Sequence, residues 1–535
     1  MSIEAFRLEN FMAFKDTGWI EIRPVCLLFG ANSSGKSAII RALRLLKQSM
    51  MFGSLDEPLV FYNEGGIDLG NFRTVIHQNN ENHVISYHFR CRFYEKGIDD
   101  LRKKINETLK AQQKPTISIT DKSYQILDIV MSFGFDQSEE QVEFVGFNII
   151  CPWDILKNEA NIVFSAERQI IISEENDGED KWSWSERWYL YSDFLQGHKH
   201  DRDPVWADVS LNLMPGFVPT LISGVRVSDN RGSVSNRDFI LVNDLLKEFY
   251  RILESFLKDF EWIGPVRPEP ERIIYLDRAT LRNWRQRGLG AYADLLQGKL
   301  NQSKYEQLDI WIRKLGLGLG FSFKSSGNDA IGTLSQVKIK NSATEEEKDL
   351  TDVGFGASQV LPVLAAGLTS QSISLLAIEQ PELHLHPKAQ IVLANIMVEI
   401  ARRGIPLLLE THSEHFLLRI QRWAVESALT LDNKSKESLE EDKLPVDKER
   451  YLDSSEIRIY FVYCDQSNDS ITELYQIPIG SDGELDLSNA PAEFDDFFID
   501  DIDDTIALAR ATISYNTNPT VEADENSEVD DESNN

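Results

Sequence analysis

Apolar residues along the chain alternate between the spacing of strands and the spacing of helices. Residues 2–50 predict a strand, a turn, a strand, a loop and a helix, and they include an apolar strand at 25–29. Residues 351–425 predict helix, strand, helix, strand and helix. An order of this kind is typical of a doubly wound sheet covered by helices. The two segments therefore predict an α/β fold class.

The residues between these segments predict a mixed α+β insertion. Strand patterns occur in three places, at 60–95, 117–172 and a hairpin at 319–340. Helical patterns also occur in three places, at 98–113, 237–260 and 290–315. Two further stretches predict irregular structure, a polar acidic loop at 173–187 and an extended, proline-rich segment at 263–272.

The C-terminal part of the chain changes gradually from folded patterns to charged ones. We expect a charged surface loop at 432–450, strands at 456–480 and a disordered acidic tail. The chain then divides into an N-terminal lobe, the insertion, a C-terminal lobe, a small C-terminal domain and the tail. Their bounds are 1–50, 51–345, 346–430, 431–515 and 516–535.

Composition narrows the class of protein. The 535 residues are 42% apolar, which allows a sizeable core, and no apolar run reaches the roughly 18 residues that span a bilayer. The N-terminus lacks the pattern of a signal peptide and the four cysteines are scattered, so we expect a cytoplasmic protein that does not contact membranes. The net charge of −31 argues against a protein coated in nucleic acid.

One local patch departs from this acidic character. Arg278, Arg282 and Arg285 recur at helical spacing and would form a basic stripe. Such a stripe could meet the phosphates of DNA, or it could pair with acidic groups of the same chain.

The strongest motif is a glycine-rich loop between an apolar strand and a helix. Residues 30–37 read GANSSGKS, which fits the pattern G-x-x-x-x-G-K-[ST]. The glycines let backbone N–H groups point at phosphates, and the following helix adds its positive N-terminal dipole. Lys36 can reach the β- and γ-phosphates, and the Ser37 hydroxyl can ligate Mg²⁺. The loop predicts binding of ATP and Mg²⁺ by Gly30, Asn32, Ser33, Ser34, Gly35, Lys36 and Ser37.

Acidic residues and a histidine follow two apolar runs near the C-terminal end of the core. Glu379 follows the apolar run at 375–378, at the strand edge where open α/β sheets bind ligands, and Glu382 comes soon after it. We expect Glu379 to hold the metal together with Ser37. The next apolar strand, 405–410, leads into His412, which would lie near the γ-phosphate.

Small residues precede an apolar helix at 360–368. Gly354, Gly356 and Ser358 would form a second anion site at the N-terminus of this helix. Because Lys36 and Ser37 already hold the phosphates of their own chain, the simplest role of this segment is to cap the γ-phosphate bound by another copy. The sequence therefore predicts an ATP-dependent homodimer. It does not decide whether Gly356 or Ser358 contacts the phosphate.

Several motifs in this order resemble the ABC-type ATPase heads of the SMC, RecF and OLD-like families, over residues 1–50 and roughly 350–425. DVGFGASQVLP resembles their signature segment, LLAIEQPELHLHP their Walker B and D-loop, and LLLETHSEH their switch histidine. The resemblance implies a P-loop NTPase head with an insertion and a small C-terminal α/β extension. It also implies hydrolysis of ATP to ADP and phosphate.

Three other segments, IGPVRPEPER, DLGNFRTVIHQ and EIRIYFVYCD, resemble a bacterial subgroup of stand-alone ATPases. Such ATPases occur in anti-phage defence modules of the Septu and PARIS kind. This resemblance implies a separately encoded nuclease or toxin as the partner. The alternatives are an ATPase of DNA repair or chromosome maintenance, and an ATP-binding scaffold that hardly hydrolyses ATP.

Gln380 departs from the family pattern. ABC heads place Asp and then Glu at the end of the Walker B strand, whereas this chain has Glu379 and then Gln380. A glutamine cannot accept a proton as a carboxylate does. Either Glu382 or His412 compensates, or hydrolysis is slow and ATP acts mainly as a clamp of the dimer.

Overall fold

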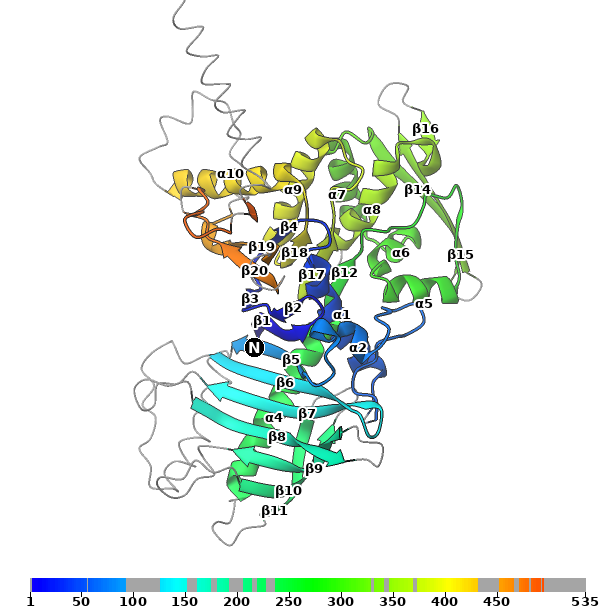
Figure 1. Ribbon diagram of the computed structural model, residues 1–535. Coiled ribbons are helices and arrows are strands. Elements are labelled where there is room, and N and C mark those ends of the chain that lie inside the picture. The colour runs from blue at the N-terminus through cyan, green and yellow to red at the C-terminus, as the bar shows by residue number, and fades with distance from the viewer. Residues whose placement is uncertain are drawn as a thin grey trace, which may run out of the picture. The chain divides into compact units, whose positions relative to one another are not determined.

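The structure is a computed structural model of the chain. Met1–Asn489 forms one compact unit and Ala490–Asn535 a second. All the labelled helices and strands of Figure 1 belong to the first unit. The structure describes residues 2–54, 56–92, 126–151, 161–174, 180–191, 205–213, 219–227, 236–328, 332–340, 346–368, 373–431, 452–465, 471–480, 483–491 and 493–494.

Three predictions concern residues outside these ranges, namely the helix at 98–113, the loop at 432–450 and the tail beyond 516. The division into five parts stays a prediction. Within the described ranges, no helix combines the length and the apolar character of a membrane span.

One large sheet carries most of the strands, and its first part is antiparallel. Along this part the strand order is β11-β10-β9-β8-β7-β6-β5-β1-β2, with β3 (Ile20–Glu21) also paired to β1. The bounds in chain order are β1 Ser2–Phe11, β2 Phe14–Asp16, β5 Ile85–Arg92, β6 Ile126–Asp136, β7 Gln141–Cys151, β8 Asn161–Glu174, β9 Asp180–Tyr191, β10 Val205–Leu213 and β11 Pro219–Val227.

The second part of the sheet is parallel and has the order β19-β4-β18-β17-β12, and β20 joins it to β2. Every residue of β4, β17 and β18 is buried, as expected for strands covered on both faces. The apolar runs of the sequence are these strands, and the mixed sheet confirms the α/β fold class. The bounds are β4 Val25–Gly30, β12 Phe260–Ile263, β17 Leu375–Glu379, β18 Leu407–Glu410, β19 Ile457–Asp465 and β20 Ile471–Ile477.

Helices surround the parallel strands, and their order confirms the pattern predicted for 351–425. Figure 1 shows them gathered around β4, β17 and β18. Pro362 inside α8 supplies no N–H for the carbonyl one turn earlier. The bounds are α1 Lys36–Phe52, α8 Phe355–Leu368, α9 Pro387–Arg402 and α10 Glu414–Leu431.

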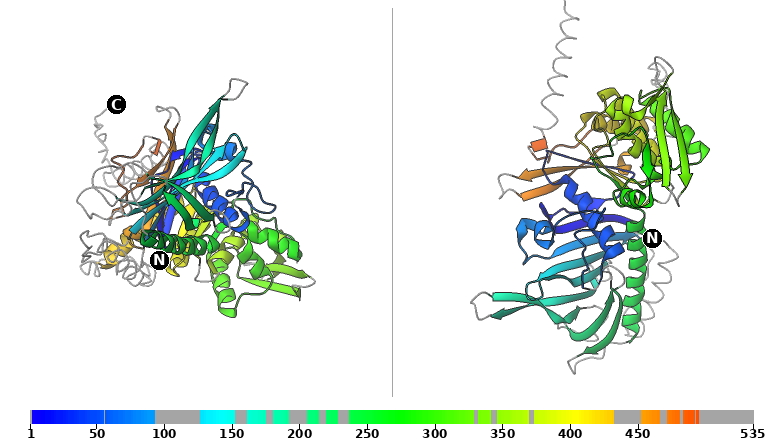
Figure 2. Two further views of the ribbon diagram at one scale, coloured as in Figure 1. Left: turned by 90° about the horizontal axis from the view of Figure 1, so that it is seen from below. Right: turned by 90° about the vertical axis from the view of Figure 1, so that its right-hand side faces the viewer.

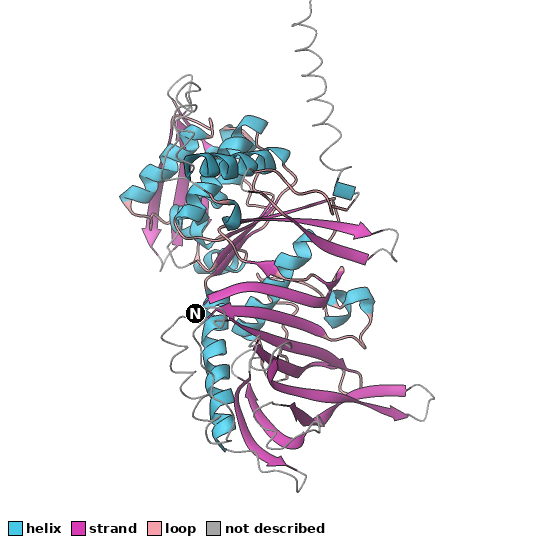
Figure 3. Cartoon of the chain, turned by 90° about the vertical axis from the view of Figure 1, so that its left-hand side faces the viewer, coloured by secondary structure: helices cyan, strands magenta, loops and turns pink. Residues whose placement is uncertain are grey.

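One long helix, α4 (Asn236–Lys258), lies across the antiparallel strands, as Figure 3 shows. Phe249 on its inner side meets Phe89 of β5, with ring centroids 6.4 Å apart. Leu253 and Leu257 of the same helix are buried. The amphipathic helix predicted at 237–260 is therefore confirmed, and its apolar stripe covers the sheet.

The loop predicted at 173–187 is wrong. Residues from Asp180 onward form β9, which pairs antiparallel with β8. Trp184 is buried, and its backbone N–H donates to Asp136 Oδ2 at 2.9 Å. The acidic residues of this stretch had indicated a loop, but a buried tryptophan and the strand ladder outweigh that local preference.

A smaller sheet with three helices lies beside the parallel strands, as Figure 2 shows. Its hairpin of β14 (Gly320–Asn328) and β15 (Gly332–Lys340) confirms the one predicted at 319–340. The remaining members are β13 Ile274–Leu276, β16 Glu347–Asp349, α5 Arg278–Gln286, α6 Gly290–Leu296 and α7 Gln302–Lys314.

Candidate functional site

The glycine-rich loop leaves β4 and enters α1, as predicted. Gly30 (φ 143°), Ser33 (φ 62°) and Gly35 (φ 103°) have positive φ, which wraps the backbone into a tight loop. A Cβ on Gly30 would lie 2.1 Å from the Val462 carbonyl oxygen of β19, so only glycine fits there. Within the part of the chain that the structure describes, no side chain caps the start of α1, so its first N–H groups can meet a ligand.

Lys36 folds back over this loop. Its Nζ donates to the carbonyl oxygens of Gly30 at 2.8 Å and Ala31 at 2.6 Å, and the residue is buried. Burial lowers the pKa of Lys36, and the carboxylate of Glu410 opposes that shift. The ammonium group is therefore held at the loop, where an incoming phosphate would replace the carbonyl oxygens as its partner.

Ser37 contacts an acid that the sequence prediction missed. Its Oγ lies 3.0 Å from both carboxylate oxygens of Glu410, the last residue of β18. Glu410 pairs in register with Glu379, the last residue of β17. Burial, and next the charge of Glu379, raise the pKa of Glu410 to about 7. The available signal for Glu410 was a charged residue at the end of the apolar run LLLE.

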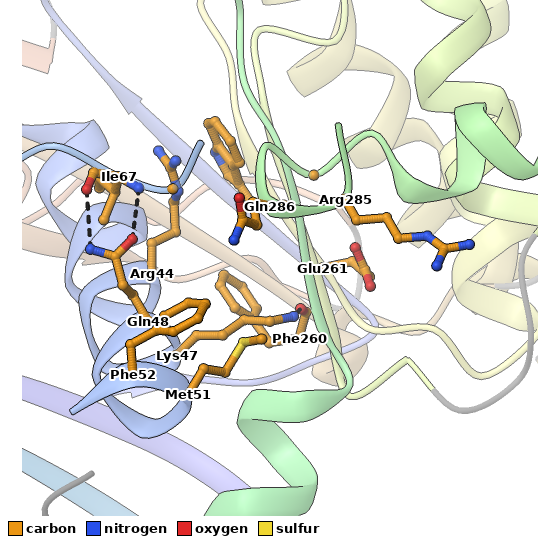
Figure 4. Close-up of a pocket in the computed structure, with 13 residues that line it drawn as sticks. Arg44, Lys47, Gln48, Met51, Phe52, Ile67, Phe260, Glu261, Arg285 and Gln286 are labelled. Atoms are coloured by element: carbon orange, nitrogen blue, oxygen red, sulfur yellow. Dashed lines mark hydrogen bonds between the residues drawn. The ribbon is translucent and has the colours of Figure 1, made fainter. Parts of the chain in front are cut away.

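Glu379 is held by a tryptophan. The Trp262 Nε1–H donates to Glu379 Oε1 at 2.6 Å, and the guanidinium of Arg44 lies 3.3 Å from the centroid of the Trp262 ring. Figure 4 shows Arg44 on α1, with Arg285 and Gln286 from the end of α5 around the same small pocket. Burial lowers the pKa of Arg44 to about 10, so its charge remains at neutral pH. Neither Trp262 nor Arg44 was predicted.

The turn after Glu379 gathers the other predicted residues. Gln380 has φ 47°, and its N–H donates to the Glu410 carbonyl oxygen at 2.7 Å. Glu382 is buried, and its Oε1 accepts the backbone N–H of His412 at 2.9 Å. Burial raises the pKa of Glu382, whereas burial and then Lys36 lower the pKa of His412. The four predicted catalytic residues therefore lie at one edge of the sheet.

The predicted signature residues begin α8 and differ in exposure. A Cβ on Gly356 would lie 2.6 Å from the His384 carbonyl oxygen, so this position packs tightly on the turn after β17. The Ser358 hydroxyl donates to the Phe355 carbonyl oxygen at 2.7 Å, and the residue is only 2% exposed. Gly354 is exposed, with no atom within 4 Å of an added Cβ. Gly354 is thus the most accessible of the three.

The elements of this edge also hold a buried arginine. Arg267, from the proline-rich segment, donates to the carbonyl oxygens of Gln359, Glu379 and Gln380 at 2.9 to 3.0 Å. These contacts could not be predicted from the sequence, because an arginine between prolines in an extended segment usually faces solvent.

The three predicted arginines of the basic stripe lie on α5, as expected. All three are exposed, and with Lys299 they line a hollow of about 1130 Å³ that also meets the C-terminal end of α1. Arg285 forms an exposed ion pair with Asp294 at 3.1 Å, which contributes little to stability.

The groups around Ser37 offer the oxygen ligands that Mg²⁺ prefers. Mg²⁺ prefers oxygen ligands and is usually bound by one or two carboxylates together with substrate phosphates and water. Ser37, Glu410 and Glu379 supply a hydroxyl and two carboxylates at one place. Among the described residues, no group of three or more His, Cys, Asp and Glu side chains is arranged to hold a metal alone.

The sequence matches the family described as AAA ATPase domain over residues 1–197 and 289–417. The chain belongs to the AAA ATPase domain family. The match includes the phosphate loop, α8 and both carboxylate strands, so the AAA ATPase domain contains the whole candidate site except the Trp262–Arg267 segment. No curated protein matches the chain.

Three similar solved structures are SMC head domains. A head bound to the C-winged helix domain of ScpA has 9% identity and a TM-score of 0.41, covering 89% of this chain and 98% of that one. The head from Thermotoga maritima has 10% identity and a TM-score of 0.33, covering 90% and 100%. A head with an extended coiled coil, bound to a ScpA domain from Pyrococcus furiosus, has 9% identity and a TM-score of 0.35, covering 89% and 96%.

The raised pKa of Glu410 predicts a stability that depends on pH. The unfolded chain releases this proton near pH 4.5, whereas the folded protein keeps it until about pH 7. Stability that is present below pH 4.5 is therefore lost as the pH rises through about 7. We expect Glu410→Gln to remove this loss, on the order of 2 kcal/mol, in chemical unfolding of the nucleotide-free protein at pH 5 and pH 8. The exposed Glu64→Gln is the control, and identical pH dependence in both variants would contradict the prediction.

Proposed function

We propose that this chain is a Mg²⁺-dependent ATPase whose two copies close head-to-head around ATP and so regulate a partner effector. The observation that supports it most is the juxtaposition of Lys36, Ser37 and Glu410 at the end of the phosphate loop. These groups come from residues up to 373 positions apart. Their chemistry is that of triphosphate and metal binding.

In this proposal each residue at the edge of the sheet has a role. Backbone N–H groups of Asn32 to Gly35 would cradle the phosphates, and Lys36 would neutralise the β- and γ-oxygens. Ser37, Glu410 and Glu379 would hold Mg²⁺, which neutralises charge on the phosphates when bound. Trp262 fixes the Glu379 carboxylate so that it need not reorganise.

The site has a poor general base for activating the attacking water. Gln380 cannot accept a proton, and one oxygen of Glu382 is occupied by the His412 N–H. Burial raises the pKa of Glu382, and so disfavours the carboxylate form that could accept a proton. We therefore propose slow hydrolysis, in which bound ATP holds the dimer closed for a long time.

The dimer supplies the missing side of the nucleotide pocket. The exposed N-terminus of α8, at Gly354, would face the γ-phosphate bound to Lys36 of the other copy. The regulated partner would be a separately encoded nuclease or toxin of an anti-phage defence module. The resemblance of three sequence segments to ATPases of such modules supports this partner.

Turnover measurements test the ATPase proposal. We expect Lys36→Ala to abolish Mg²⁺-dependent phosphate release, because the γ-phosphate loses its fixed cation. Gln380→Glu should raise kcat at least tenfold by supplying a general base. The rates are measured by release of inorganic phosphate with and without Mg²⁺. A Lys36→Ala variant as active as the wild type would overturn the proposal, and unchanged kcat in Gln380→Glu would overturn its slow-hydrolysis part.

Mixing two inactive variants tests the composite pocket. Gly354→Trp fits the open space around this position, so it should fold normally but block a partner's phosphate. A mixture of Gly354→Trp and Lys36→Ala chains should recover about a quarter of the wild-type rate, since half of the dimers are mixed and each has one intact pocket. Each variant alone is the control. A mixture that stays inactive, with ATP-loaded protein monomeric by light scattering, contradicts the dimer.

A second candidate function is direct binding of DNA through the α5 hollow. The three exposed arginines and Lys299 concentrate positive charge on an otherwise acidic chain. This reading corresponds to an ATPase of DNA repair or chromosome maintenance, with DNA as the ligand.

Salt-dependent binding distinguishes this candidate. We expect replacement of Arg278, Arg282 and Arg285 by Gln to weaken duplex binding at least tenfold. The slope of log Kd against log salt should fall by about 2 to 3. Fluorescence anisotropy of a labelled duplex between 50 and 200 mM salt measures both quantities. The control replaces the exposed Arg251, Arg313 and Arg422 by Gln, and equal losses in the two triple variants would exclude the α5 site.

A further inference from the structure

Arg267 joins two elements of the candidate site, α8 and the turn after β17. Its Nη1 donates to the Gln359 carbonyl oxygen in α8 at 3.0 Å. Its Nη2 donates to the carbonyl oxygens of Glu379 at 2.9 Å and Gln380 at 3.0 Å, at the end of β17. One guanidinium group therefore holds both α8 and the Glu379–Gln380 turn.

The charge of Arg267 makes these contacts strong. The residue is only 5% exposed. Burial lowers the pKa of Arg267 to about 10, with Glu382 and then Glu379 opposing the shift, so the group stays protonated at neutral pH. Hydrogen bonds from a charged donor are roughly twice as strong as neutral ones, and three of them converge on this planar fork.

The chain around Arg267 is stiff. Pro265 and Pro268 flank it, and each fixes its own φ and restricts the preceding residue. Val266 is 83% exposed while Arg267 is buried, so the two side chains face opposite ways. Upstream, β12 pairs in register with β17 from Phe260 to Ile263. The guanidinium group is thus carried by a stiff backbone segment beside β17.

Two buried polar atoms next to this fork lack partners. Among the described residues, Arg267 Nε and Glu382 Oε2 have no hydrogen-bond partner. An unpaired buried polar atom costs about 1 to 3 kcal/mol. The two groups nevertheless attract each other electrostatically.

We propose that Arg267 is a positioning residue that makes the N-terminal part of α8, at Gln359, and the Glu379–Gln380 turn move as one. The inference rests on the proposed function, because α8 caps a partner's nucleotide while Glu379 serves the nucleotide of its own chain. Because Arg267 links the two elements, binding of a nucleotide at one pocket of the dimer changes the position of the Glu379–Gln380 turn in the other pocket. The two pockets then respond together.

Substitution of Arg267 by lysine tests the planar guanidinium group separately from its positive charge. An ammonium group keeps the positive charge, but it cannot reach three carbonyl oxygens from two elements at once. Arg267→Lys should therefore fold and bind ATP yet lose the link. Arg272→Lys is the matched control, because Arg272 is an exposed arginine of the same segment that pairs with Asp349 and Asp352 just before α8.

Hydrogen exchange read by mass spectrometry tests the link directly. The protein is kept dilute enough to be monomeric by light scattering, and a slowly hydrolysed ATP analogue is added with Mg²⁺. Wild type and Arg272→Lys should gain protection both at 355–360 and at 379–383. Arg267→Lys should gain it only at 379–383. Its kcat should fall at least tenfold, while its Kd for a fluorescent ATP analogue changes less than threefold.

The possible failures have different meanings. Protection of 355–360 in Arg267→Lys equal to that in wild type would overturn the inference, as would an α8 that never responds in wild type. If Arg267→Lys has a lowered thermal midpoint, Arg267→Gln replaces it in the same comparison. Failure of the wild type to bind the fluorescent analogue would instead overturn the proposed function.

Discussion

Parallel pairing of β4 with β18, and of β18 with β17, brings three strand ends to one edge of the sheet. Gly30, Glu410 and Glu379 stand at those ends. Two buried carboxylates side by side repel each other, and Lys36 and Ser37 from the loop only partly compensate. A divalent cation would relieve the repulsion between the two carboxylates, and Lys36 and the loop can receive a polyphosphate beside it. This constraint underlies every role assigned to the edge.

Glu379, at the end of β17, is held by two residues of the short segment 262–267. Trp262 holds the Glu379 side chain, and Arg267 holds its carbonyl oxygen. Both residues fall inside the stretch that the sequence assigns to the insertion, yet β12 is an edge of the parallel sheet. The insertion and the nucleotide site thus share a structural boundary, and changes in one are placed to reach the other.

Much of this fold follows from local patterns, because buried parallel strands leave unbroken apolar runs and α4 leaves a clear helical stripe. The phosphate loop could be read for the same reason, since its glycines and lysine are adjacent in the chain. Trp262 and Arg267 could not, because each acts through a partner far away in sequence, and the sequence signal for Glu410 was only its place at the end of an apolar run. The missed strand β9 is similar, since burial of Trp184 is decided by a neighbouring strand and not by its own acidic surroundings.

The position of β4 between β18 and β19 has a consequence for biosynthesis. Both neighbours come from the last third of the chain, and Gly30 itself lies in register with Val462. Until the ribosome has translated β18 and β19, β4 has two unpaired edges, and unpaired edges favour aggregation. The loop cannot acquire its final shape until β19 has emerged. Synthesis must therefore proceed past β19 before the loop can hold a nucleotide in this shape, and until then the two edges of β4 are open to other chains and to chaperones.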